Sequence, residues 1–341
     1  MNQDEARQLK ALLQRELVGA QQAIAIQEPP LSIEMGVRSI DMTTASLQQF
    51  AYVANIPRHE SFQTDLVLAT PALGIARRDK EFLLAVRVQT EGEAANPFID
   101  LLTDRSDGQL DVRSAVGARA HSGGAGNRHR PVIPGVSIGR INGVTGTLGC
   151  FITRQGGVVE GLASNHVLAD ANRGATGDDV LQPGIHDGGT TPNDRVGELS
   201  YFHPLVSPPQ ANAIDAALCK FDDAIAAVPP SPPLTAFDVD PGEGVRKQGR
   251  TTGQTQGEVS AIEIDGLVLD VPGIGPAIFD GVFEVESGDG SAFSDLGDSG
   301  ALVTDLAGAR GAGILLGGLG PVSWVIPLST TLQVLKAALV T

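Results

Sequence analysis

The sequence has few aromatic residues, two cysteines and no long hydrophobic run. Phe, Trp and Tyr make up 4% of its 341 residues, whereas 42 residues are glycine. Few aromatics and many glycines favour a chain of short strands and turns over one of long helices. The longest apolar stretch begins at Ala312 and is interrupted by glycine and proline. We therefore expect no transmembrane helix.

The two cysteines, Cys150 and Cys219, are too few for a disulfide framework and lack the Cys-x-x-Cys spacing of a zinc site. Each lies in an apolar stretch, where burial disfavours the thiolate that a cysteine nucleophile needs. The N-terminal MNQDEARQLK does not resemble a signal peptide. Together these features predict a cytoplasmic protein with two reduced thiols.

Positive charge is also scarce. The chain has 24 Lys and Arg residues against 40 Asp and Glu, and its formal net charge is −16. Residues 1–130 carry 14 basic and 16 acidic side chains, whereas residues 131–341 carry 10 and 24. An acidic surface repels phosphate backbones and anionic lipids, so we expect no nucleic-acid partner and no membrane partner.

Hydrophobic patterning divides the chain into four parts. Residues 1–30 contain leucines at helical spacing and predict an amphipathic helix, with Asn2 and Glu5 as a capping box. Residues 31–116 predict a small α+β domain, and the composition of residues 117–135 predicts a linker. From residue 136 to residue 341, short apolar runs alternate with turns, which favours an antiparallel barrel or sandwich.

Within the α+β domain we expect a short helix near Ala45 and strands at Phe82–Gln89, at Phe98–Leu102 and from Gln109. The N-terminal helix either docks on the body of the protein or binds a protein partner. A flexible linker next to it would suit a regulatory region over residues 1–115.

The segment GDSGALV, at Gly297–Val303, has the residues of a nucleophile turn. Serine is a weak nucleophile at neutral pH and needs a base to accept its proton. A glycine two residues before Ser299 lets backbone N–H groups face a developing oxyanion without a Cβ in the way. An ordinary glycine-rich turn between strands is the alternative.

Two other segments each offer a partner for this serine. In GLASNHVLAD, His166 follows an apolar run and precedes a turn, where an imidazole can face a cleft as a general base. In NAIDAALCKF, Asp215 starts an apolar segment, and a carboxylate that enters a core must be paired. Taken singly, a structural histidine and a surface aspartate are the alternatives.

The order His166, Asp215, Ser299 is that of the trypsin-like serine peptidases, and the surrounding residues resemble that family's motifs. SNHVLA resembles its histidine motif, with Asn165 where many members have alanine; IDAALCKF resembles its aspartate segment, and GDSGALV its serine motif. The resemblance covers about residues 136–330. In particular, the chain resembles a bacterial intracellular group whose members also carry an N-terminal α+β region.

This resemblance implies a mainly-β fold: two six-stranded antiparallel β-barrels with a cleft between them, preceded by the N-terminal helix and the α+β domain. It also implies a serine endopeptidase that hydrolyses polypeptide substrates through an acyl-enzyme intermediate. Ser299 would attack, His166 would carry the proton, and Asp215 would orient the imidazole. The N–H groups of Gly297 and Ser299 would form the oxyanion hole. No metal and no organic cofactor are expected.

The resemblance also implies where the substrate pocket lies. Its floor would be Phe293, six residues before the serine, and the facing strand would place Gly317 and Gly318 beside it. An apolar floor rejects Lys and Arg, because an unpaired buried charge is costly. We therefore expect a small or medium apolar side chain before the scissile bond. Asp295 turned into the pocket would reverse this preference.

Several other expectations concern roles that the sequence does not favour. No IVGG-type N-terminus precedes the first barrel, so Asp298 should bond locally rather than to a new terminal amine. The segment Gly249–Gly257 predicts a hairpin turn rather than a phosphate cradle. Asp178, Asp179, Asp187 and Asp194, in and just before the polar loop Leu181–Arg195, are candidates for calcium, but their spacing fits no EF-hand.

Among the other functional classes, an α/β-hydrolase is excluded because position 301 is alanine and no histidine follows the serine. A non-catalytic binding or scaffold protein on the same fold stays open as the alternative to an enzyme.

Overall fold

The computed structural model describes residues 1–26, 70–90, 99, 102–103, 105–117, 119–120, 127–154, 157–225, 227 and 234–340. The chain forms two compact units, Met1–Val116 and Gly117–Thr341. The short helix expected near Ala45 lies outside the described residues. Among the described helices, none combines the length and the apolar composition that a membrane crossing requires.

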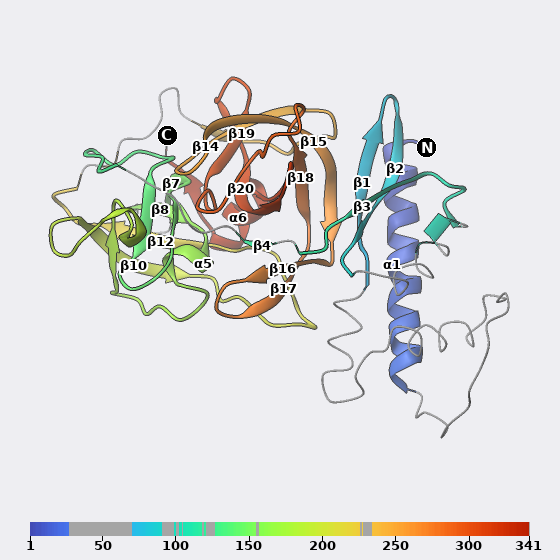
Figure 1. Ribbon diagram of the computed structural model, residues 1–341, viewed down its shortest axis with the longest axis horizontal. Coiled ribbons are helices and arrows are strands. Elements are labelled where there is room, and N and C mark those ends of the chain that lie inside the picture. Colours follow the sequence, from blue (N-terminus) through green and yellow to red (C-terminus); the bar gives the residue numbers. More distant parts are fainter. Residues whose placement is uncertain are drawn as a thin grey trace. The chain divides into compact units, whose positions relative to one another are not determined.

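The first unit packs one helix on a small sheet (Figure 1). Its elements are α1 (Gln3–Ile26), β1 (Ala72–Arg78), β2 (Glu81–Val88) and β3 (Leu110–Ser114). β2 pairs antiparallel with β1 and parallel with β3. Leu13 and Leu17 of α1 pack with Leu73, Leu84 and Val86 of the sheet.

The predicted start of α1 is confirmed. Asn2 accepts a hydrogen bond from the Glu5 N–H at 2.9 Å, and Glu5 accepts one from the Asn2 N–H at 2.8 Å. The reciprocal bonds satisfy two N–H groups that the helix itself cannot pair.

The predicted strand at Phe98–Leu102 is wrong for the residues that are described there. Ile99 and Leu102 are helical, and the Thr103 hydroxyl donates to the Ile99 carbonyl at 2.7 Å. An apolar run of five residues does not distinguish a strand from a helix turn, and Leu102 is buried against the leucines of α1.

The second unit contains a closed barrel of six antiparallel strands (Figure 1). The pairing runs from β14 through β15, β18, β21, β20 and β19 back to β14. The strands are β14 (Gly244–Gly249), β15 (Gly253–Asp265), β18 (Val282–Glu286), β19 (Leu302–Asp305), β20 (Arg310–Leu319) and β21 (Val322–Pro327). Register shifts at Ala261 bend the long strand β15 around the barrel.

The other sheet of this unit is a curled half-barrel with the order β22-β7-β8-β12-β10-β9-β5-β6. Its strands are β5 (Ser137–Arg140), β6 (Thr145–Thr147), β7 (Cys150–Thr153), β8 (Val159–Ala163), β9 (Asp179–Leu181), β10 (Arg195–Phe202), β12 (Ala217–Phe221) and β22 (Ala338–Leu339). β22 pairs with β7 at one end of the sheet, and β6 pairs with β5 at the other.

Further elements complete this unit. These are β4 (Arg119–Ala120), α5 (Asn165–Leu168), the 3-10 helix η2 (Ile185–Asp187), β11 (Ala211–Asn212), β13 (Thr235–Ala236), β16 (Leu267–Val271), β17 (Gly275–Phe279) and α6 (Leu328–Leu335). Five of them, β4, β11, β13, β16 and β17, belong to the sheet that contains the barrel. β4 and the residues from 127 onward come from the segment that the sequence predicts as a linker; in that segment Val132 is buried.

Candidate active site

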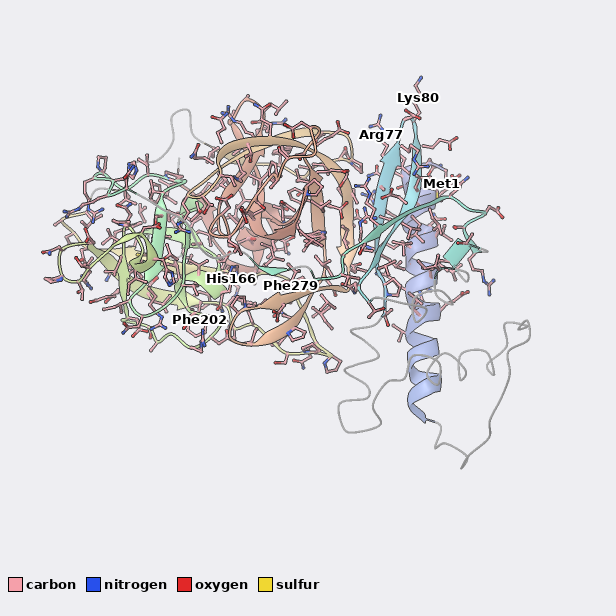
Figure 2. The ribbon with its side chains drawn as sticks, in the orientation of Figure 1. Met1, Arg77, Lys80, His166, Phe202 and Phe279 are labelled. Carbon is pink, nitrogen blue, oxygen red and sulfur yellow. The ribbon has the colours of Figure 1, made fainter. Side chains whose placement is uncertain are left out.

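His166 and Asp215 form a buried pair in the second unit. His166 lies in α5 (Figure 2), and Asp215 lies between β11 and β12. The Asp215 carboxylate faces Nδ1 of the imidazole with one oxygen and accepts the backbone N–H of His166 at 3.1 Å with the other. A carboxylate at Nδ1 holds the proton there, which leaves Nε2 as the proton acceptor. Among the described residues, Nε2 of His166 has no hydrogen-bond partner.

The residue before His166 fixes the helix turn that carries it. Asn165 donates to the His203 carbonyl at 2.6 Å and to the Asn172 side chain at 2.9 Å. It also accepts the Asn172 N–H at 3.1 Å. An alanine at position 165 would make none of these bonds. The departure from the common family motif is therefore a local anchor for α5.

Ser299 lies in a tight turn between β18 and β19 that packs against the half-barrel. Its backbone carbonyl accepts the Thr147 N–H at 2.9 Å, and its hydroxyl donates to the Leu316 carbonyl of β20 at 3.0 Å. Gly300 has φ +91°, and a Cβ there would lie 3.3 Å from the N–H nitrogen of Ser164, the residue before α5. The serine turn therefore lies beside the turn that carries His166.

Backbone geometry on both sides of the serine requires glycine. Gly297 has φ +103° and Gly300 has φ +91°, conformations that other residues rarely adopt. The N–H groups of Asp298 and Gly300 donate to the carbonyls of Asp295 and Leu315. The expected oxyanion donors, Gly297 and Ser299, thus belong to a turn that its neighbours hold on both sides.

A buried ion pair lies next to the turn that contains Ser299. Lys247 Nζ lies 3.0 Å from Asp298 Oδ2, and both side chains are fully buried. Asp298 also accepts bonds from the Thr251 N–H at 2.8 Å and the Thr252 hydroxyl at 2.6 Å. The residue before Ser299 is therefore held by a lysine and a hairpin turn of the same unit.

Burial and ion pairing shift the pKa of Asp298 in opposite directions, and the same holds for the pKa of Lys247. Burial alone would raise the pKa of Asp298, but the Lys247 ammonium and the hydrogen bonds from Thr252 and Thr251 outweigh it and hold this pKa below its ordinary value. Burial lowers the pKa of Lys247, and Asp298 opposes part of that shift.

A second buried ion pair joins the half-barrel to the barrel. Arg250 donates to Asp187 from Nε at 2.8 Å and from Nη2 at 2.5 Å, and Ser137 bonds the same carboxylate. The Arg250 N–H also donates to the hydroxyl of Thr147 at 3.1 Å. Because Thr147 binds the carbonyls of Gly297 and Ser299 as well, this network positions the serine turn.

The sequence pointed to neither Lys247 nor Arg250, although one signal existed for the lysine. Val245, Lys247 and Gly249 alternate along β14, and all three are buried. A lysine at an inward position of a strand demands an anionic partner. Arg250 is in the segment Gly249–Gly257, which is the hairpin turn that the sequence predicted: Gly249 pairs with Gly253 across it.

The four aspartates that were candidates for calcium each pair with an arginine. Asp178 pairs with Arg140, Asp179 with Arg195, Asp187 with Arg250 and Asp194 with Arg128. In the part of the chain that the structure describes, no group of His, Cys, Asp and Glu could hold a metal ion.

Both cysteines are free and buried. Burial raises the pKa of Cys150 to about 12, and burial likewise raises the pKa of Cys219. Thiols of this kind are protonated at neutral pH, so neither is a nucleophile.

The predicted pocket residues occupy different environments. Phe293 is fully buried, and its carbonyl accepts the Thr255 hydroxyl at 2.6 Å. Asp295 is exposed, and its carboxylate accepts the N–H of the next residue at 2.7 Å. Gly317 and Gly318 lie on β20, opposite β21 on one side.

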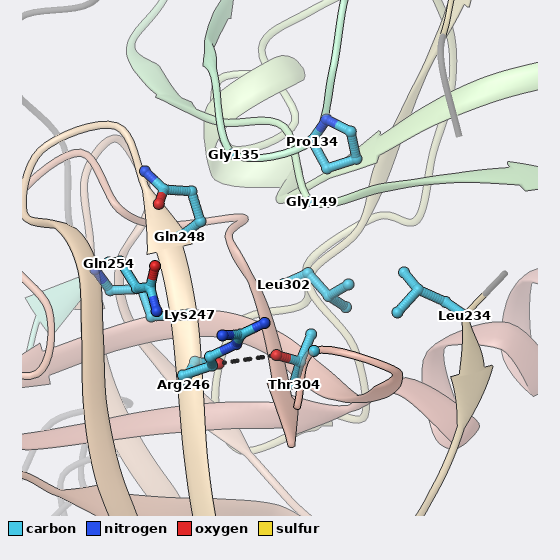
Figure 3. A pocket seen from close by; sticks show the side chains of 11 residues that line it. Pro134, Gly135, Gly149, Leu234, Arg246, Lys247, Gln248, Gln254, Leu302 and Thr304 are labelled. Carbon is cyan, nitrogen blue, oxygen red and sulfur yellow. Dashed lines mark hydrogen bonds between the residues drawn. The ribbon is translucent and has the colours of Figure 1, made fainter. Parts of the chain in front are cut away.

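A cavity of about 190 Å³ lies elsewhere between the sheets (Figure 3). Pro134, Gly135 and Gly149 line it from one side, with Arg246 and Leu302 of the barrel strands among the other lining residues. His166, Asp215 and Ser299 are not among the residues that line it. The cavity is therefore not the space in which a substrate would meet the serine.

No protein-family model matches the chain, and no curated protein sequence matches it. Its structure is similar to solved serine proteases. Protease A of Thermobifida fusca is 19% identical with a TM-score of 0.43; the match covers 62% of this chain and 98% of that one. A chymotrypsin of Cellulomonas bogoriensis is 18% identical (TM-score 0.42, 62% and 98%), and a Nocardiopsis protease is 16% identical (0.45, 62% and 99%).

The closed barrel, the half-barrel and the N-terminal helix confirm the fold class that the motifs predicted. A closed barrel beside a curled half-barrel is the kind of architecture that the resemblance to the trypsin-like serine peptidases implied. The half-barrel differs from the expected closed ring of six strands, because its strand order ends at β22 and at β6.

Proposed function

We propose that this chain is a serine endopeptidase that acts through His166, Asp215 and Ser299. Ser299 Oγ attacks the scissile carbonyl and gives its proton to His166 Nε2. The N–H groups of Gly297 and Ser299 hold the oxyanion of the tetrahedral intermediate. The intermediate expels the amine, which takes the proton from Nε2. Water then hydrolyses the acyl-enzyme in the same way.

The observation that carries this proposal is the buried His166–Asp215 pair. The two side chains are 1% and 0% exposed, and the imidazole turns an unpaired Nε2 away from the carboxylate. A purely structural histidine in a core normally has both ring nitrogens bonded. A general base needs one nitrogen without a partner.

The serine needs one change before it can react. Its hydroxyl donates to the Leu316 carbonyl, so this hydrogen bond must break before the hydroxyl can donate to His166 Nε2. The change costs one hydrogen bond and forms another to the histidine.

The buried Phe293 and the exposed Asp295 favour apolar side chains before the scissile bond. The test is a peptide library digested by the wild type and by Ser299→Ala. The wild type should cleave after small or medium apolar residues, and Ser299→Ala should cleave nothing. Cleavage after Arg or Lys that is lost in Asp295→Ala would overturn the predicted preference for apolar residues. Equal cleavage by the wild type and Ser299→Ala would overturn the proposed peptidase activity.

The alternative is a non-catalytic binding protein on this fold. The bond from Ser299 to the Leu316 carbonyl favours it, because the hydroxyl is not bonded to its base. A binding protein would retain library peptides on a column without shortening any of them, which the same digestion detects by mass.

A further inference from the structure

The short strand β4 lies between two other strands of the second unit. Ala120 pairs antiparallel with Gly317 and Arg119 with Gly318, both on β20. On its other side, Arg119 pairs parallel with Asp270 of β16. Figure 1 shows β4 beside the β16–β17 hairpin. A strand of two residues cannot form on its own, so these two edges make a slot that holds an extended segment.

The β20 edge of this slot leads directly to the candidate nucleophile. Leu316 precedes Gly317, and its carbonyl accepts the hydroxyl of Ser299. Because Arg119 faces Gly318 and Ala120 faces Gly317, β4 runs toward Leu316 in its N-to-C direction. A peptide substrate must approach the serine with the same polarity, since the acyl carbonyl lies at the C-terminal end of the bound segment.

The β16 edge is anchored to the segment that carries Asp215. β17 pairs with β16 along its whole length and with Ala211–Asn212 of β11, three residues before the aspartate. The Asn212 side chain also donates to the Ile278 carbonyl at 3.0 Å. β16, the strand on the outer side of the slot, is therefore held through β17 to the segment that carries Asp215.

The site beside the slot is closed to solvent. Ser299 is 0% exposed and His166 is 1% exposed, although a peptidase must bring a substrate carbonyl to both. Main-chain pairing with a sheet edge is a general way to bind an extended peptide. The segment that makes this pairing here belongs to the chain itself.

We propose that Arg119–Ala120 is an intramolecular competitor of substrate, because it occupies the edge of β20 with which a peptide bound at Ser299 would pair. The inference rests on the proposed function, because a competitor of substrate presupposes an enzyme. Occupation of the slot by β4 can be tested by peptide binding alone. Substrates bind as an added strand between Gly317–Gly318 and Asp270, and they must displace β4 to do so.

The test removes the strand from the slot without touching the site. Proline has no N–H and a fixed φ, so Arg119→Pro combined with Ala120→Pro abolishes pairing on both edges. The matched control, Gly124→Pro combined with Ala125→Pro, places two prolines in the same glycine-rich segment beyond the strand. Equal thermal unfolding midpoints of the full-length variants show that folding is unaffected.

Binding is measured on full-length Ser299→Ala, so that no cleavage intervenes. The probe is a fluorescent peptide with the sequence of residues 116–121, VGARAH. The Arg119→Pro/Ala120→Pro form should bind it at least tenfold more tightly than the parent and the control, a difference of about 1.4 kcal/mol. Equal affinity for all three proteins, or no binding by any, would overturn the inference.

Turnover separates this inference from the proposed function. With Ser299 present, the double proline variant should lower KM for a peptide ester at least tenfold while kcat stays within about twofold of the parent. No hydrolysis by either form contradicts the proposed function and leaves the binding result to decide on the slot. An unchanged KM with normal kcat contradicts the competitor and not the enzyme.

Discussion

At the scale of single residues, the chemistry depends on which polar groups are buried together. The sequence singles out His166, Asp215 and Ser299, because each stands in a motif whose residue types suit one role. The structure pairs two of them and places the third in the neighbouring turn. Their partners Lys247 and Arg250 could not be predicted so easily, because an ion pair between distant segments leaves little trace in a local pattern.

Asp215→Asn should keep the fold and lose about 10⁴-fold in kcat, as in the archetypal serine protease triad. An asparagine can still accept the His166 N–H, but its amide favours the wrong tautomer of the imidazole. Steady-state hydrolysis of a peptide ester checks this, with Asp179→Asn as a control outside the site. Near-normal turnover would mean that another carboxylate orients His166.

The Lys247–Asp298 pair should govern part of the acid stability. The pKa of Asp298 is held below its ordinary value of 3.8, so its contribution is present above pH 3.8 and is lost as the pH falls through the lower, folded value. The free energy of unfolding should therefore fall less steeply below pH 3.8 in Lys247→Met/Asp298→Asn than in the wild type. Urea unfolding of both proteins at several pH values measures this free energy.

Two variants sharpen that measurement. Lys247→Met alone leaves a buried carboxylate without its partner and should cost about 3–5 kcal/mol at neutral pH, more than the double variant. Asp289→Asn, at a fully exposed carboxyl whose pKa is also lowered by Ser291, serves as the control. A double variant as unstable as Lys247→Met would contradict the pairing.

At the scale of elements, the strands that coincide with an apolar run were predictable, whereas β14, β18 and the strands of two residues were not. Apolar runs between glycine-rich turns gave β7, β8, β12, β15, β16, β19, β20 and β21, because each run is long enough to carry its own pattern. β4 lies in a segment without hydrophobic period. Its pairing partners Gly317 and Gly318 stand almost 200 residues further along the chain, and no local pattern contains such a contact.

The β14–β15 turn should be intolerant of a side chain at Gly249. A Cβ there would lie 2.3 Å from Asp298 Oδ1, so Gly249→Ala must displace the carboxylate that Lys247 and Thr252 hold. We expect a loss of more than tenfold in kcat and a lower unfolding midpoint. Gly288→Ala is the control, because nothing lies within 4 Å of its Cβ. Equal activity of the two variants would show that the turn does not position the serine.

At the scale of the whole molecule, the chain joins an acidic peptidase-like unit to a helix-and-sheet unit, with the division at Val116–Gly117. The sequence predicts a boundary after residue 116 because the change from hydrophobic period to Gly, Arg and His is abrupt there. The composition of the first unit does not indicate its role. Its leucine cluster explains its own stability and no more.

Residues 1–115 should restrict access of large substrates or dock a partner. We expect residues 117–341 alone to cleave a folded protein substrate several times faster than the full chain, with little change on a short peptide. The check is kcat/KM on both substrates, together with thermal unfolding of each protein. Equal activity and equal stability would reject both a regulatory and a stabilising role.

The central claim is that Ser299 is a nucleophile activated by His166, and a fluorophosphonate probe tests it most directly. The account predicts covalent labelling of the wild type at Ser299, located by peptide mass spectrometry. Labelling should disappear in Ser299→Ala and fall at least 100-fold in rate in His166→Ala. A wild type that stays unlabelled, even when Arg119→Pro/Ala120→Pro has emptied the slot, would contradict it.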